Sequence, residues 1–91
     1  MAKVYVVERW ERHAEEKEIL SKAHSTIEAA KAAALVDFES FRGKVNDPRI
    51  KLGDWTNLDM ENMVSFISCG SDDPDEDWLV AQWTVYGLDL D

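Results

Sequence analysis

The amino-acid sequence predicts a single α+β domain, residues 1–91, with a four-stranded antiparallel sheet and one helix packed on one face. Two observations predict it. Apolar residues recur at helical spacing between Ser25 and Arg42, and period-two patterns lie on both sides of that segment, giving the order ββαββ. The 45% hydrophobic content, including four Trp, three Phe and two Tyr, suffices for one core in a chain of 91 residues.

The first two strands are predicted as a hairpin. Lys3 to Arg12 is rich in β-forming residues, and Val4, Val6 and Trp10 fall on one side of a period-two pattern. The polar residues 13–17 then turn the chain. A short second strand follows through Ile19, Leu20 and Ala23.

The helix is predicted over Ser25–Arg42. Ser25-Thr26-Ile27-Glu28 fits a capping box, and Gly43 is suited to the left-handed residue that ends a helix. One stripe is apolar: Ile27, Ala30, Ala34, Leu35, Phe38 and Phe41.

The opposite helix face is small and uncharged, with Ala29, Ala32, Ala33, Val36 and Ser40. Two interpretations are open. Alanine has a high helix propensity, which explains the composition without any partner. Alternatively, Ala29, Ala32, Ala33 and Val36 form a second packing surface, as in a homodimer.

The remaining segments complete the sheet. Residues 43–58 contain turn residues and scattered apolar residues, which indicates an ordered loop with or without a short strand. A strand is predicted from Met60 to Cys69, in which Met63, Ser65, Ile67 and Cys69 alternate with Val64 and Phe66, and a Gly- and Pro-containing turn follows. The last strand, Trp78 to Leu88, places Leu79, Ala81, Trp83 and Val85 on one face.

Charge is segregated along the chain. Residues 1–53 carry nine acids and ten bases, whereas residues 54–91 carry ten acids and no Lys or Arg, giving the net charge of −9. A field of one sign attracts basic partners and repels polyanions. Direct nucleic-acid binding is disfavoured, since it depends on Lys and Arg neutralising phosphates.

Two acidic groups are candidate partner-binding residues. The first, in a turn, is Asp72, Asp73, Asp75, Glu76 and Asp77; the second is Asp54, Asp59 and Glu61. The turn is either a solvated loop that protects strand edges or a polyanionic surface that docks on a basic groove. Trp55 and Trp78 lie beside these groups as candidate aromatic anchors, with a place in the core as the alternative.

Catalytic and metal chemistry find little support. Asp73-x-Asp75-x-Asp77 matches the start of an EF-hand loop, but Trp78 and Thr84 stand where that loop needs Gly and Glu. Cys69 could pair with His13 or His24 as a nucleophile and its base, but no third residue is indicated that would orient the histidine. We therefore expect no enzyme activity, no cofactor and no metal. One cysteine and the lack of a long apolar run favour a cytoplasmic protein without a membrane span.

In layout and charge the chain resembles small acidic phage proteins, among them anti-CRISPR inhibitors and other DNA mimics. The resemblance rests on Lys3-Val4-Tyr5-Val6-Val7-Glu8, the helix after Ser25 and the all-acidic second half. It implies a viral inhibitor or modulator that presents carboxylates to a basic, nucleic-acid-handling protein in the host cytoplasm. The main alternative is a structural or accessory homo-oligomeric protein whose acidic half serves solubility. An enzyme subunit or a ligand-binding domain that uses a pocket between helix and sheet is a third interpretation.

Overall fold

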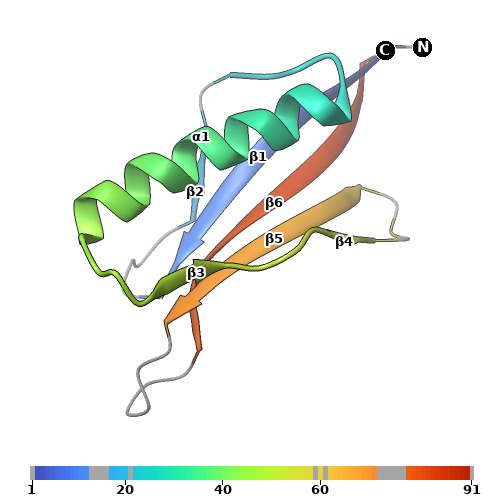
Figure 1. Cartoon of the computed structure of the whole chain (residues 1–91). Helices are drawn as coiled ribbons and strands as arrows, with labels where there is room; N and C mark the ends of the chain where they lie inside the picture. The colour runs from blue at the N-terminus through green and yellow to red at the C-terminus, as the bar shows by residue number, and fades with distance from the viewer. Residues whose placement is uncertain are drawn as a thin grey trace.

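The computed structural model describes residues 2–12, 17–20, 22–58, 60, 62–71 and 78–90. It confirms an α+β fold, in which helix α1 (Ile27–Val45) packs on one face of an antiparallel sheet (Figure 1). In the described part of the chain the sheet has six strands and the element order is ββαββββ, so the predicted four strands in the order ββαββ are wrong. They are β1 (Ala2–Glu11), β2 (Glu18–Ile19), β3 (Ile50–Leu52), β4 (Thr56–Asn57), β5 (Met63–Ser71) and β6 (Leu79–Leu90). Their order in space is β2-β1-β6-β5-β3, and β4 also pairs with β5.

The two additional strands come from the segment predicted as a loop. Leu52 of β3 pairs with Cys69, and Thr56 of β4 pairs with Phe66, a register shifted by one residue. Between them the Gly53 amide donates to the Ser68 carbonyl at 2.8 Å. β3 and β4 are therefore one edge strand interrupted by a bulge at 53–55. Runs of three and two residues are too short for a period-two pattern to be recognised.

Both predicted helix ends shift. Thr26, not Ser25, is the N-cap, and its hydroxyl accepts from the Ala29 amide at 3.1 Å. At the other end the helix runs through Gly43 to Val45 and stops at Asn46, whose φ is 53°. Asparagine tolerates the left-handed conformation. Pro48 follows two residues later and disfavours helical backbone at the residue before it.

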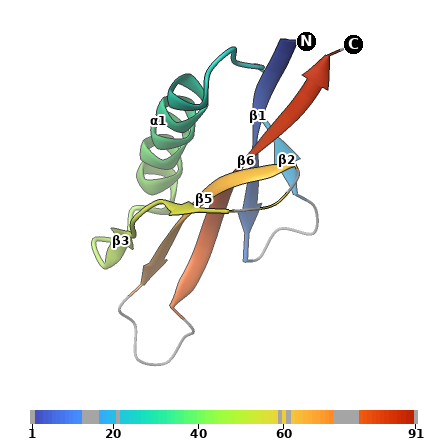
Figure 2. The ribbon, with the colours of Figure 1, turned by 90° about the vertical axis from the view of Figure 1, so that its right-hand side faces the viewer.

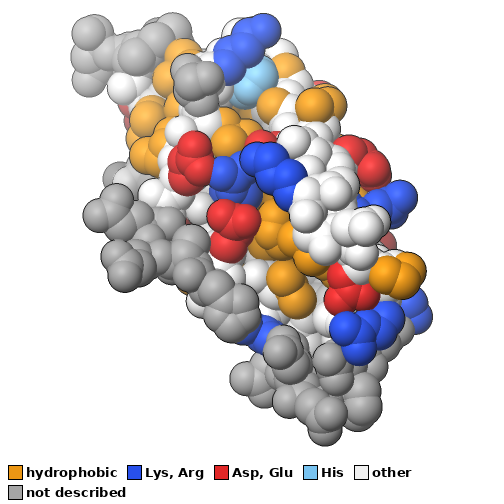
Figure 3. Space-filling view, turned by 90° about the vertical axis from the view of Figure 1, so that its left-hand side faces the viewer, with side chains coloured by type: hydrophobic (Ala, Val, Ile, Leu, Met, Phe, Trp, Pro, Cys, Tyr) orange, Lys and Arg blue, Asp and Glu red, His pale blue; other side chains and the backbone are white. Residues whose placement is uncertain are grey.

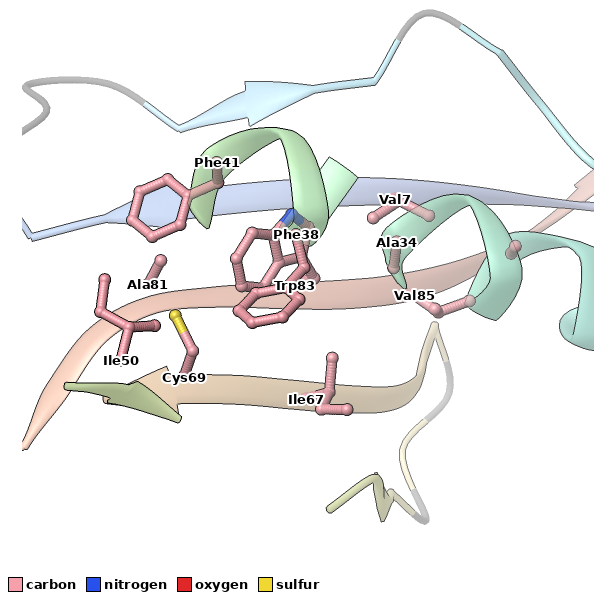
Figure 4. Packing of buried hydrophobic residues seen from close by; sticks show 11 residues of the cluster. Val7, Ala34, Phe38, Phe41, Ile50, Ile67, Cys69, Ala81, Trp83 and Val85 are labelled. Carbon is pink, nitrogen blue, oxygen red and sulfur yellow. The ribbon is translucent and has the colours of Figure 1, made fainter. Parts of the chain in front are cut away.

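The core lies between α1 and one face of the sheet, here called the core face. Trp83 is at its centre, with Phe38 and Phe41 packed edge-on at ring distances of 5.7 Å (Figure 4). The buried hydrophobic residues are Val7, Ala30, Ala34, Phe38, Phe41, Ile50, Ile67, Cys69, Ala81, Trp83 and Val85. The predicted helix stripe is thus confirmed, with Ile27 and Leu35 half-buried at its margin.

Two irregularities change the face of predicted core residues. Register shifts occur between Met63 and Ser65 and between Cys69 and Gly70. Because side chains alternate across a strand, one extra residue moves the next side chain to the other face. Met63 and Leu79 therefore depart from the alternation predicted for their strands and line the face opposite the helix.

Candidate binding face of the sheet

The face of the sheet opposite α1 has no helix over it in the described part of the chain (Figure 2). Residues that are paired across two strands share a face of the sheet. Val7 and Val85 are paired on the core face, so the pair of Glu8 with Thr84 lies on the opposite side. We call this side the open face. It comprises Val6, Glu8, Trp10, Phe66, Ser68, Gln82, Thr84 and Tyr86.

Aromatic side chains distinguish the open face from an ordinary solvated face. Trp10, Phe66 and Tyr86 are each half-buried there, together with Val6. Solvated faces of antiparallel sheets are usually polar. Val4, Val6 and Trp10, grouped by the sequence pattern, do share a side, and it is this one; Val7 is the β1 residue fully buried in the core.

A row of polar groups runs among these side chains. The Ser68 hydroxyl donates to Gln82 Oε1 at 3.1 Å, and Gln82 Nε2 donates to the Thr84 hydroxyl at 3.5 Å. The Tyr86 hydroxyl donates to Glu8 Oε1 at 3.0 Å. Burial, followed by the hydrogen bond to Glu8, raises the pKa of Tyr86, so that its hydroxyl remains a donor.

A hollow of about 280 Å³ opens on this face. Thr84, which is 5% exposed, lies within its lining. The side chains around it that carry aromatic or polar groups are Glu8, Trp10, Lys17, Gln82, Thr84 and Tyr86. Lys17 Nζ is 3.6 Å from Glu8 Oε1. The hollow thus combines a carboxylate, a cation and aromatic rings.

Most of the predicted acidic residues cannot be placed on any face. Asp59, Glu61, Asp72, Asp73, Asp75, Glu76 and Asp77 lie outside the described residues. Asp54 is described and is exposed within the edge-strand bulge, next to Gly53, whose amide donates to the Ser68 carbonyl of β5.

Trp55 has partners within the molecule. It is half-buried against the core cluster, and Lys31 Nζ of α1 lies 5.0 Å from its ring centroid. This cation–π contact links the edge-strand bulge to the helix. The geometry favours the interpretation of Trp55 as part of the core.

Trp78 is the more accessible of the two tryptophans, at 44% exposure. Its ring rests on Gly70, where an added Cβ would come within 2.1 Å of the ring. Its carbonyl accepts from the Ser71 amide at 2.9 Å. Gly70 is thus required to seat the indole, a role that the sequence pattern did not reveal.

The alanine face of α1 is turned away from the sheet. Ala29 and Ala32 are exposed, Ala33 is half-buried, and Val36 is 72% exposed. Over the face shown in Figure 3, Lys and Arg side chains are interspersed with Asp and Glu, and hydrophobic side chains lie between them. No large area of one sign is visible among the coloured residues of that view.

The sequence analysis missed a polar group beneath the helix. Asp37 Oδ2 accepts from Arg9 Nη1 at 2.7 Å and from Trp83 Nε1 at 2.8 Å. Arg9 also pairs with Glu18 of β2. One carboxylate therefore joins α1 to β1 and β6. The sequence did contain a sign of this group. Asp37 lies three residues after Ala34 and four before Phe41, so it is a carboxylate at a position of the apolar stripe, where a polar partner is needed.

Two of the candidate catalytic residues, Cys69 and His24, lie far apart. Cys69 is buried, and burial raises the pKa of its thiol to about 11. His24 pairs with Tyr5 at the far side of β1, so that β1 and β6 separate it from β5 by at least about 14 Å. His13 lies outside the described residues. Within the ranges the structure describes, no metal-binding cluster is found and no helix is long and apolar enough to span a membrane.

Comparison of the chain with models of protein families, with curated proteins and with solved structures finds no match.

Proposed function

We propose that this chain is a binding protein, an inhibitor or modulator that docks on a basic surface of a nucleic-acid-handling protein in a host cytoplasm. The observation that carries the proposal is the open face of the sheet, which no described helix covers and on which Trp10, Phe66 and Tyr86 are half-buried. Aromatic residues are enriched at protein interfaces and supply much of their binding energy. The separation of Cys69 from His24 lends no support to an enzyme.

Charge supports a basic partner. Residues 1–53 carry nine acids and ten Lys or Arg, whereas residues 54–91 carry ten acids and no Lys or Arg, and half of those ten acids lie between positions 72 and 77. The excess negative charge therefore belongs to the second part of the chain. Such charge accelerates encounter with a basic surface, whereas desolvated aromatic contacts slow dissociation.

The test starts from affinity capture on the immobilised chain and continues with the purified partner. We expect a basic protein whose binding to nucleic acid is displaced by this chain. Replacing Asp72, Asp73, Asp75, Glu76 and Asp77 by Asn or Gln should slow association and weaken its salt dependence. Trp78→Ala should mainly speed dissociation. A neutralised variant that associates as fast as wild type at low salt would eliminate the electrostatic part of the proposal.

A second candidate function has one observation in its favour. The exposed Ala29, Ala32 and Val36 leave a neutral strip on α1, which would suit a structural or accessory homo-oligomer. In that case the acidic segments would serve solubility.

A further inference from the structure

We propose that the hollow on the open face binds the guanidinium group of an arginine side chain supplied by the basic partner. This inference rests on the proposed function and names the chemistry of its central contact. Three features of the hollow carry it: an acceptor of opposite charge, aromatic walls, and a cation already placed at the acceptor.

The acceptor is Glu8. Its side chain is 18% exposed, and its contacts with Tyr86 and Lys17 are both made through Oε1. Among the residues the structure describes, no hydrogen bond to Glu8 Oε2 is formed. An ion pair at a partly buried carboxylate is screened less than one in bulk water. Glu8 Oε2 can therefore accept a hydrogen bond from a second strong donor.

The walls favour a planar cation. Trp10 and Tyr86 both line the hollow, and a guanidinium stacks on aromatic faces better than an ammonium does. Gln82 Oε1 accepts one hydrogen bond from Ser68, and an amide oxygen has two lone pairs. Arginine brings five donors in a fixed fork, which suits a carboxylate next to an amide oxygen.

Lys17 shows that the site accepts a cation. Its ammonium lies 3.6 Å from Glu8, although its side chain remains 60% exposed. Because the Lys17 side chain is itself largely exposed, its pair with Glu8 is weaker than a fully desolvated one, so a guanidinium that also stacks on the aromatic rings can displace it. The volume of about 280 Å³ lies just below the range of drug-sized sites, which fits one side chain rather than a cofactor.

The experiment titrates the full chain with a short polyarginine peptide and with a polylysine peptide of equal length, by calorimetry at low salt. We expect tighter binding of polyarginine. Glu8→Gln keeps an acceptor for Tyr86 but removes the charge, and should weaken polyarginine binding about tenfold or more. Glu39→Gln, on the exposed side of α1, is the matched control and should leave affinity unchanged. Lys17→Ala removes the internal competitor and should tighten binding about two- to fivefold.

The Lys17 variant separates recognition from a structural role, since loss of a merely structural pair would not raise affinity. Equal binding of both peptides, or polyarginine binding that is insensitive to Glu8→Gln and Lys17→Ala, would overturn the arginine site. In that outcome wild-type binding to both peptides would still support the proposed function. Failure of both peptides to bind at low salt would overturn the proposed function and the arginine site together.

Discussion

The two faces of the sheet are built from the same strands yet differ in what covers them. On the core face, Trp83 is fully buried under Phe38 and Phe41 of α1. On the open face, Trp10 and Phe66 are half-buried, and no described element covers them. Both faces carry aromatic side chains, but among the described residues a helix packs only on the core face. The difference suggests that folding stability resides mainly on the core face and binding on the open face.

The first prediction compares one tryptophan from each face. Trp83→Ala removes a fully buried ring and should lower the free energy of unfolding by about 4 kcal/mol. Trp10→Ala removes a half-buried ring and should cost only about 1 kcal/mol. Urea denaturation of both variants measures this, with Trp83→Phe as the milder variant if Trp83→Ala does not fold. Similar losses at the two positions would contradict the division between the faces.

The second prediction concerns the polar group under the helix. Asp37→Ala leaves the buried Trp83 indole N–H without its acceptor and removes one of the carboxylates paired with Arg9, which keeps Glu18, so it should cost about 2 to 3 kcal/mol. Glu39→Ala, on the same helix, breaks an exposed contact with Arg42 at 3.9 Å and should cost less than about 0.5 kcal/mol. Equal costs in thermal denaturation would show that Asp37 is not a structural centre.

The third prediction concerns pH. The pKa of Cys69 is raised from 9.0 to about 11 because burial disfavours the thiolate. A group with a raised pKa in the folded state stabilises the protein fully below its unfolded pKa. That contribution disappears as pH rises through the folded pKa. The free energy of unfolding should therefore fall by about 2 kcal/mol between pH 9 and 11 on account of this thiol.

Urea denaturation at several pH values measures that loss, and Cys69→Ala should reduce it. Tyr86, whose pKa is also raised, adds to the same alkaline loss, so Tyr86→Phe separates its share. A wild-type slope that Cys69→Ala leaves intact would refute the assignment to the thiol.

The smallest expected effect is on the exposed side of α1. Val36 is 72% exposed, so Val36→Glu should change stability by no more than about 0.5 kcal/mol. Light scattering then decides the role of the alanine face. A wild-type dimer that this substitution converts to a monomer would place an interface there; a monomer in both cases would remove the homo-oligomer alternative.

The elements with a long periodic pattern could be predicted from the sequence, whereas the short strands and the register shifts could not. The stripe from Ala30 to Phe41 and the long strands were predictable, because burial of one face imposes a period. β3 and β4 were not, since five paired residues carry too little pattern. The change of face at Met63 and Leu79 depends on register shifts that only cross-strand pairing defines.

The candidate site was predicted less well than the fold. Acidic residues were prominent in the sequence, but the number of acidic residues does not show which surface of the fold they lie beside. Glu8 was passed over because a single carboxylate in a strand has no spacing signature; its proximity to Tyr86, 78 residues later, arises only from the pairing of β1 with β6.

The central claim is that the open face binds basic ligands while the helix side does not. Amide chemical-shift mapping of the isotope-labelled chain with a short polyarginine peptide tests it directly. We predict that the largest shifts occur at Glu8, Trp10, Thr84 and Tyr86, and that Ala29, Ala32 and Val36 stay unchanged. Shifts concentrated on the alanine face of α1, with none on the open face, would contradict the account.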